Sequence, residues 1–177
     1  KPSPINFQNG SFQTPTIDLS VNYPDPYQTF QMAQVPGWST YPANSAYVSD
    51  PKSYYIEYRK VDAAGAYIDT NGDATTEANG DQYAELNCYY PGILYQNSTT
   101  TPGYKIYWQF AHRARRGVGN LSGTGLDVMN FYLVPGGYSS GTPSSSSLIT
   151  TASDNALDWY YYRGAYTVPS GQNTTGF

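Results

Sequence analysis

Proline and glycine interrupt most windows of twelve residues in this chain, which leaves little room for long helices. Windows with apolar residues at the helical spacing of three and four positions are also hard to find. Short runs rich in β-branched and aromatic residues recur instead. Such runs predict strands, which we expect at residues 7–12, 17–21, 53–61, 82–89, 93–96, 105–112, 127–134 and 158–168.

Turn-forming segments separate these runs, as at PDP (24–26), DTNGD (69–73) and TTTPG (99–103). About eight short strands with this punctuation predict an all-β fold, a two-sheet antiparallel β-sandwich. The 177 residues suit one domain, so we expect a single sandwich module over residues 1–177, taken from a larger protein.

Alternation of residue character supports the sandwich, because a half-buried strand repeats every two residues. Segment 104–112 has one face with Ile106, Trp108, Phe110 and His112, and another with Tyr107, Gln109, Ala111 and Arg113. Segment 82–88 has one face with Gln82, Ala84, Leu86 and Cys88, and another with Tyr83, Glu85 and Asn87. The first face of each segment is predicted to point into the core.

Charged side chains are sparse, at 12% of the chain, whereas tyrosine alone contributes 20 residues. Globular proteins usually carry about a quarter charged residues, so we expect an extracellular or cell-surface attached protein.

Cys88 is the single cysteine, which allows no intrachain disulfide and favours a bacterial source. The net charge of −4 argues against nucleic acid, and no apolar run approaches the ~20 residues needed for membrane insertion.

Polar residues near the end of segment 105–112 form the first candidate site. If segments 82–88 and 105–112 are neighbouring strands, their polar side chains converge on one surface. Recognition of a sugar needs hydrogen-bonding groups matched to its hydroxyls and a flat apolar plate beside them. The candidate ligand-binding residues are Tyr83, Glu85, Asn87, Tyr107, Gln109, His112, Arg113, Arg115 and Asp127.

Structural roles compete with binding at several of these positions. The polar face can also be a solvated sheet surface with an Arg–Glu pair across the strands. His112 shares a face with Trp108 and Phe110, which favours a buried neutral imidazole bonded to a loop carbonyl. For Arg115 and Asp127, the alternative is an internal ion pair between them that orders the connection between their strands.

The segment DTNGDATTEANGD (69–81) is a candidate calcium site. Asp69, Asn71 and Asp73 have the spacing of the first three ligands of a calcium loop. Ala74 and Gly80 depart from that loop at its sixth and twelfth positions. The alternative is a hairpin tip rich in turn formers.

A series of motifs occurs in an order that resembles the galactose-binding-like jelly-roll domains of bacterial surface proteins and carbohydrate-active enzymes. The motifs are NGSF (9–12), VPGW (35–38), GDQYAELN (80–87), LYQ (94–96), TTPG (100–103), WQFAHRARRG (108–117), DVMNFYLVP (127–135) and WYYYRGAYTVPSGQ (159–172). The resemblance implies a jelly-roll sandwich that binds sugars. It also implies a structural calcium near the N-terminal motif, where Gln13 replaces the acidic ligand expected in the family.

These observations predict a non-catalytic carbohydrate-binding module whose partner is a glycan or polysaccharide. The alternative is an adhesin or structural spacer that binds a host surface protein or presents neighbouring domains, with tyrosine-rich loops as its contact surface. An enzyme is disfavoured, because nothing in the sequence brings its three glutamates, Glu57, Glu77 and Glu85, into one cleft.

Overall fold

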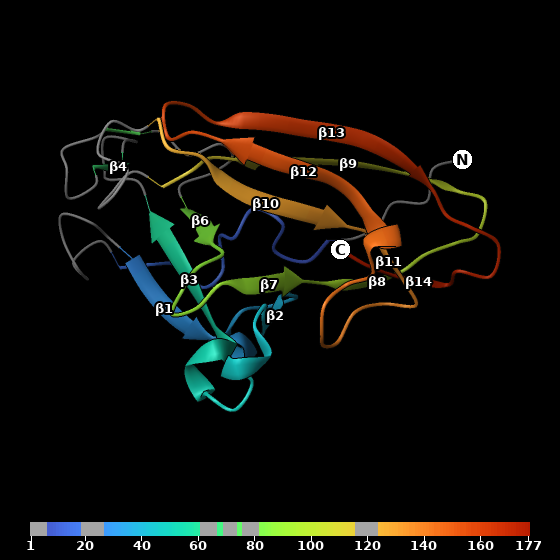
Figure 1. Cartoon of the computed structure of the whole chain (residues 1–177), viewed down its shortest axis with the longest axis horizontal. Coiled ribbons are helices and arrows are strands. Elements are labelled where there is room, and N and C mark those ends of the chain that lie inside the picture. Colours follow the sequence, from blue (N-terminus) through green and yellow to red (C-terminus); the bar gives the residue numbers. More distant parts are fainter. Residues whose placement is uncertain (1–6, 19–26, 61–66, 69–73, 76–81, 116–123) are drawn as a thin grey trace. The chain divides into compact units, whose positions relative to one another are not determined.

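The computed structural model describes residues 7–18, 27–60, 67–68, 74–75, 82–115 and 124–177. Over these ranges the protein is all-β, as the sequence predicts, and its strands pair antiparallel (Figure 1). The helical elements of the described ranges are four single turns of 3-10 helix: Met32–Gln34, Ser45–Tyr47, Pro51–Tyr54 and Ser145–Ser147. None of them has the length or the apolar character of a membrane span.

The chain divides into two compact units, which we describe separately. Unit 1 comprises residues 1–7, 95–115 and 122–177, and unit 2 comprises residues 8–94 and 116–121. The prediction of a single module over residues 1–177 stays a prediction.

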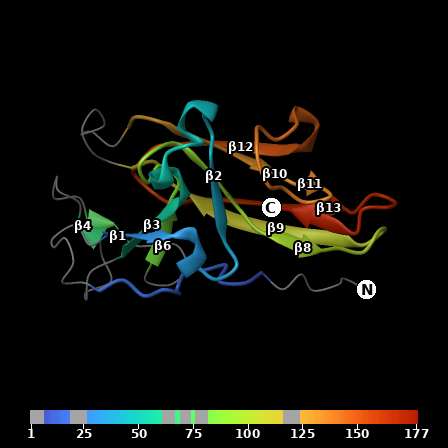
Figure 2. The same ribbon diagram turned by 90° about the horizontal axis from the view of Figure 1, so that it is seen from below.

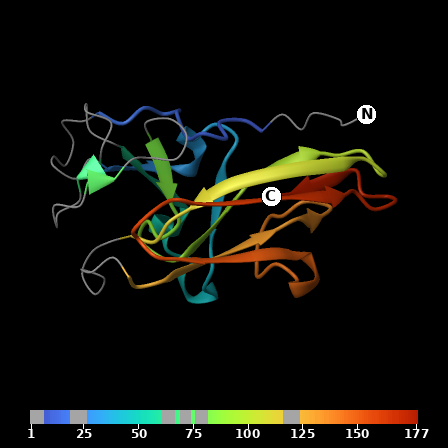
Figure 3. The ribbon, with the colours of Figure 1, turned by 90° about the horizontal axis from the view of Figure 1, so that it is seen from above.

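Unit 1 contains two two-stranded sheets built from its longest strands. β9 (Lys105–His112) pairs with β13 (Tyr160–Thr167), and β10 (Asp127–Tyr132) pairs with β12 (Leu148–Asp154). Figures 2 and 3 show β9 beside β13 in one layer and β10 beside β12 in the other. A third sheet has the strand order β11 (Val134–Pro135), β14 (Thr174–Gly176) and β8 (Asn97–Thr99).

Aromatic side chains fill the space between the two layers of unit 1. The ring of Phe131 on β10 lies 5.0 Å from that of Trp108 and 5.2 Å from that of Phe110, both on β9. Phe110 also stacks on Tyr162 of β13, with 5.1 Å between ring centroids. These contacts confirm the predicted inward face of segment 104–112 and make unit 1 a two-layer sandwich.

Unit 2 contains one three-stranded sheet and two pairs of strands. The sheet has the order β1 (Tyr27–Gln31), β3 (Tyr55–Lys60) and β6 (Gln82–Glu85). The pairs are β2 (Ser39–Pro42) with β7 (Gly92–Tyr95), which reaches the boundary between the units, and β4 (Tyr67–Ile68) with β5 (Ala74–Thr75).

The core of unit 2 surrounds Tyr58, whose side chain is completely buried on β3. Its ring makes edge-on contacts with Phe12 and Phe30, at 5.7 and 5.5 Å between centroids. Its hydroxyl donates to the carbonyl oxygen of Thr14 at 3.1 Å and accepts from Asn9 at 3.0 Å. Burial raises the pKa of Tyr58 to about 12, against a smaller opposite effect of the Asn9 hydrogen bond.

The predicted strand at 7–12 is wrong, and residues 17–18 of the predicted 17–21 strand are not extended into a sheet. Asn9 and Phe12 have φ values of 52° and 57°, which place them in the left-handed region and turn the chain. The main-chain groups of this segment hydrogen-bond to the buried carboxamide of Gln82 instead of to a neighbouring strand. It accepts from Ile17 N at 2.7 Å and donates to Phe12 O at 2.6 Å.

Candidate functional site

The outward surface of the β9–β13 ribbon carries exposed tyrosine rings, a carboxamide and cationic side chains in regularly spaced rows. We call this surface the ribbon face. Its members follow from alternation and from the strand register: Lys105, Tyr107, Gln109, Ala111, Tyr161, Arg163, Ala165 and Thr167.

Two tyrosines dominate the ribbon face. Tyr107 is 70% exposed and Tyr161 is 56% exposed. Each stands opposite an alanine on the neighbouring strand, Tyr107 opposite Ala165 and Tyr161 opposite Ala111. Both rings therefore stand beside small side chains and are largely open to solvent.

The row between the two tyrosines pairs Gln109 with Arg163. Both residues are exposed, and among the described residues neither side chain makes a hydrogen bond or an ion pair. The row therefore presents a carboxamide and a guanidinium to solvent. Together they offer seven N–H donors and one carbonyl acceptor to a ligand.

The inner surface of the same ribbon fixes the position of these groups. The indole of Trp108 packs directly on the backbone of Gly164, where a Cβ would lie 2.4 Å from its Cζ2 atom. The aromatic side chains between the two layers of unit 1 pack against the inner surface of both strands. The rows of Tyr107 and Tyr161 lie four residues apart along β9, or about 13 Å at the usual rise of a strand.

Chemically, the ribbon face can hold a flat, hydroxyl-rich ligand. Exposed tyrosine rings bury large areas at little cost in conformational entropy. Polar groups set between them fix the orientation of the ligand. The spacing of the rings fits a chain of several sugar rings better than a single one.

The structure brings Tyr107 and Gln109 together on the ribbon face, as predicted for one strand. Arg113 follows the end of β9, where its guanidinium donates to the carbonyl oxygen of Ala156, through Nε at 2.9 Å and also through Nη2. That bond fastens the loop after β12 and leaves Arg113 half-buried.

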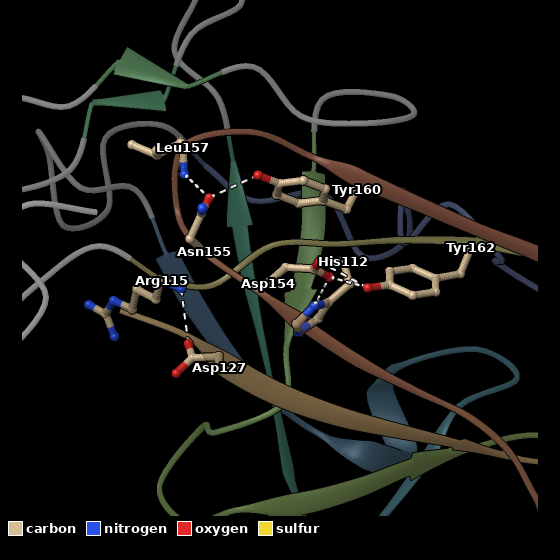
Figure 4. A network of polar contacts seen from close by, with 8 residues as sticks. All are labelled: His112, Arg115, Asp127, Asp154, Asn155, Leu157, Tyr160 and Tyr162. Carbon is tan, nitrogen blue, oxygen red and sulfur yellow. Dashed lines mark hydrogen bonds and ion pairs between the residues drawn. The ribbon is translucent and has the colours of Figure 1, made fainter. Parts of the chain in front are cut away.

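His112 is buried inside unit 1, in agreement with the prediction that it points inward. Its partner is a carboxylate rather than the loop carbonyl expected from the sequence. Nδ1 of His112 lies 2.7 Å from Oδ2 of Asp154 on β12, and the hydroxyl of Tyr162 donates to both oxygens of that carboxylate at 2.9 Å (Figure 4). Burial and this hydrogen bond raise the pKa of Tyr162.

Arg115 and Asp127 meet at the same end of the sandwich, where both are exposed. The main-chain N–H of Arg115 donates to Oδ2 of Asp127 at 3.1 Å, which ties the segment after β9 to the first residue of β10 (Figure 4). Asn155 organises the neighbouring turn, because its Oδ1 accepts from Leu157 N and from the hydroxyl of Tyr160. This network orders the end of the sandwich.

The other predicted residues, Tyr83, Glu85 and Asn87, belong to unit 2. Strand β6, which carries Tyr83 and Glu85, pairs with β3, whereas β9 pairs with β13 in a different sheet. The proposed neighbourhood of segments 82–88 and 105–112 is therefore not present in the described sheets. The structure does not gather the nine predicted residues on one sheet face.

The Glu85 carboxylate is bound to Nε of Arg59, whose Nη2 lies 2.8 Å from the Glu57 carboxylate. All three side chains are at most 15% exposed. Arg59 thus compensates two like charges that face each other across β3 and β6. This cross-strand ion triad accounts for Glu85 as a half-buried structural group.

A shallow pocket in unit 2 is lined by Lys52, Glu85, Cys88 and Tyr89, among others. Lys52 Nζ lies 5.4 Å from the centre of the Tyr89 ring, which is 46% exposed. Burial, followed by the charges of the two glutamates in the triad, raises the pKa of the Cys88 thiol to about 12. Cys88 is therefore a protonated, unreactive thiol at neutral pH.

The N-terminal calcium implied by the family resemblance stays a prediction. Nε2 of Gln82 donates to the carbonyl oxygens of Phe12 and Pro15, at 2.6 and 3.0 Å. The Gln13 carboxamide donates to the carbonyl of Ser11. The amide groups of Gln82 and Gln13 thus hydrogen-bond to main-chain oxygens of this segment. The other candidate calcium ligands, Asp69, Asn71 and Asp73, lie outside the described residues.

Sequence reasoning missed half of the ribbon face. Tyr161 and Arg163 lie in a strand that was predicted at 158–168, but nothing local identifies β9 as its partner. In the structure, exposed and half-buried residues alternate from Tyr161 to Thr167, whereas in the sequence of this strand tyrosines fall on both faces. Pairing its outward residues with those of segment 105–112 would have found the site.

Comparisons with known proteins leave the family of the chain open. No family model, no curated protein and no solved structure matches it.

Proposed function

We propose that this protein is a non-catalytic carbohydrate-binding module of a secreted or surface-attached bacterial protein. The ribbon face is its binding surface, and the ligand is a glycan or polysaccharide. The jelly-roll resemblance of the sequence points in the same direction.

The single observation that carries the proposal is the arrangement of two exposed tyrosines around a row of exposed polar groups. Tyr107 and Tyr161 flank Gln109 and Arg163 on a rigid two-stranded support. A ring on each side offers stacking to sugar C–H faces, and the donors between them match hydroxyls.

The proposed role requires no chemical step. The carboxylates of Glu57 and Glu85, two of the three glutamates of the chain, are both bound to Arg59. Stacking and a few hydrogen bonds predict a modest affinity, because a sugar buries few apolar atoms.

Affinity electrophoresis of the full chain against a panel of soluble polysaccharides tests this function. Replacing either ring, by Tyr107→Ala or Tyr161→Ala, should weaken binding about tenfold, a loss of about 1.4 kcal/mol. The matched control is Tyr89→Ala, which removes an exposed tyrosine from unit 2 and should bind as wild type. Retardation that is unchanged in both ribbon-face variants would rule out the ribbon face as the binding surface.

A second candidate function is adhesion to a host surface protein or the presentation of neighbouring domains. The observation in its favour is the tyrosine cluster of unit 2, where Tyr47 stacks on Tyr90 at 4.0 Å and Tyr55 contacts the exposed Tyr89. Such rings are common in protein interfaces. Binding to host proteins that persists after enzymatic removal of their glycans, and is lost in Tyr89→Ala, would favour adhesion.

A further inference from the structure

The ribbon face is positively charged in a chain that is negative overall. Of its eight residues, Lys105 and Arg163 are cationic and none is acidic. The whole chain has 13 acidic and nine basic residues, for a net charge of −4. A surface of this sign attracts an anionic partner and disfavours pairing with the same face of a second copy of the chain.

We infer that the ligand of the ribbon face is an acidic glycan, with carboxylate or sulfate groups repeated along its chain. This inference rests on the proposed carbohydrate-binding function and specifies its substrate class. The shared chemistry is an anionic oxygen group on successive sugar units, and uronates and sulfated sugars both provide it.

The order of the outward rows carries the argument. From one end of the ribbon to the other, the rows contain Tyr161, then Arg163 beside Gln109, then Tyr107, then Lys105. Rings and cations therefore alternate, with about 7 Å between successive rows. A polymer with one anion for each stacked sugar matches this alternation over its length.

Arg163 determines the preference for an anion more strongly than Lys105. Its guanidinium offers two parallel N–H groups that suit a carboxylate or a sulfate. It is exposed and has no hydrogen-bonding or ionic side-chain partner among the described residues, so a ligand need not displace one. Gln109 in the same row supplies an amide for the adjoining hydroxyl.

Single-stranded nucleic acid also combines anions with flat rings, but the chain fits it less well. Proteins that bind nucleic acid usually present a basic stripe, whereas this face offers two cations within an acidic chain. The glycan is therefore the occupant that the charges and the length of the ribbon favour.

The test compares acidic polymers with neutral forms of the same backbone, by titration calorimetry on the full chain. One pair is polygalacturonate and its methyl ester, a second is alginate and its carboxyl-amidated form, and a third is a sulfated galactan and its desulfated form. We expect at least one charged polymer to bind about tenfold or more tightly than its neutral form, and salt to weaken that binding. The pair that shows the effect distinguishes carboxylate from sulfate.

Charge variants locate the effect. Arg163→Gln should lower affinity for the acidic polymer about tenfold and leave affinity for the neutral form unchanged, and Lys105→Gln should do the same more weakly. Lys52→Gln, which removes a cation from unit 2, should bind both polymers as wild type. Circular dichroism of each variant checks the fold, which exposed substitutions should preserve.

Each outcome is decisive. Equal binding of charged and neutral forms, weakened by Tyr107→Ala, overturns the acidic-glycan inference and keeps the proposed function. Acidic binding that survives in Arg163→Gln and Lys105→Gln also overturns the inference. Binding of single-stranded DNA as tight as that of the best acidic polymer at 0.15 M salt overturns it in favour of nucleic acid. No binding to any glycan overturns both proposals.

Discussion

At the scale of single residues, Gly164 decides how close the core of unit 1 lies to the ribbon. Trp108 occupies the space where any side chain at this position would begin. The half-buried indole thereby packs against the strand that carries Arg163. A glycine in the middle of a strand usually weakens it, so its presence here reflects close packing.

Gly164→Ala should destabilise the protein by about 1–3 kcal/mol, because the new Cβ would lie 2.4 Å from Cζ2 of Trp108. Urea denaturation followed by tryptophan fluorescence measures the change. Ala165→Ser, at the next and outward-facing position, is the control and should change stability by at most about 0.5 kcal/mol. Equal stability of Gly164→Ala and wild type would show that Trp108 can move aside.

At the scale of elements, a buried polar pair joins the two layers of unit 1. His112 on β9 and Asp154 on β12 are 9% and 7% exposed and lie in different sheets. Tyr162 of β13 adds its hydroxyl to the same carboxylate. The pair thus ties the end of the β9–β13 sheet to the β10–β12 sheet through one acceptor.

His112→Leu should cost about 3 kcal/mol, because it leaves the Asp154 carboxylate buried with one donor fewer. Combining it with Asp154→Asn in a double-mutant cycle should reveal a coupling energy above about 1 kcal/mol. Asn130→Ala removes an exposed hydrogen bond to Thr151 on the β10–β12 sheet and should cost at most about 0.5 kcal/mol. Additive effects of the two buried substitutions would contradict the role of the pair.

Elements with regular alternation could be predicted from the sequence, and elements without it could not. The predicted strand at 105–112 matches β9, because its inward positions are large and apolar. β12, with sequence LITTASD, was absent from the prediction. Its buried positions include Ala152 and Asp154, which are too small or too polar to produce an apolar pattern. Pairing between distant strands leaves no local signal at all.

At the scale of the whole molecule, stability should fall at high pH. In the folded protein the pKa values of Cys88 and Tyr58 are both raised to about 12, from 9.0 and 10.0. Their protonated forms are therefore favoured by folding. The corresponding stability is fully present below about pH 9 and is lost as the pH rises toward 12, because the unfolded chain releases these protons first.

Urea titrations at several pH values between 8 and 11.5 measure this dependence. The urea midpoint should decrease steadily above pH 9, and Cys88→Ser should show a smaller decrease because Tyr58 alone remains. A midpoint that is constant to pH 11.5, or the same slope in Cys88→Ser, would contradict the assignment.

The short β-rich runs of the sequence predicted the all-β class correctly, but they did not predict which polar residues share one sheet surface. The candidate residues near Glu85 were chosen for their polarity, and the structure uses Glu85 in the ion triad with Arg59 and Glu57. Polarity alone cannot distinguish a compensated buried charge from an exposed one. That distinction requires the strand register, which brings Tyr161 and Arg163 beside Tyr107 and Gln109.

A nuclear magnetic resonance titration of the uniformly ¹⁵N-labelled chain with acidic oligosaccharide tests the central claim most directly. The account predicts that the largest amide shift changes fall on the ribbon face, at Tyr107, Gln109, Tyr161 and Arg163, with little change around Tyr89. Saturable shift changes confined to residues outside β9 and β13 would contradict it.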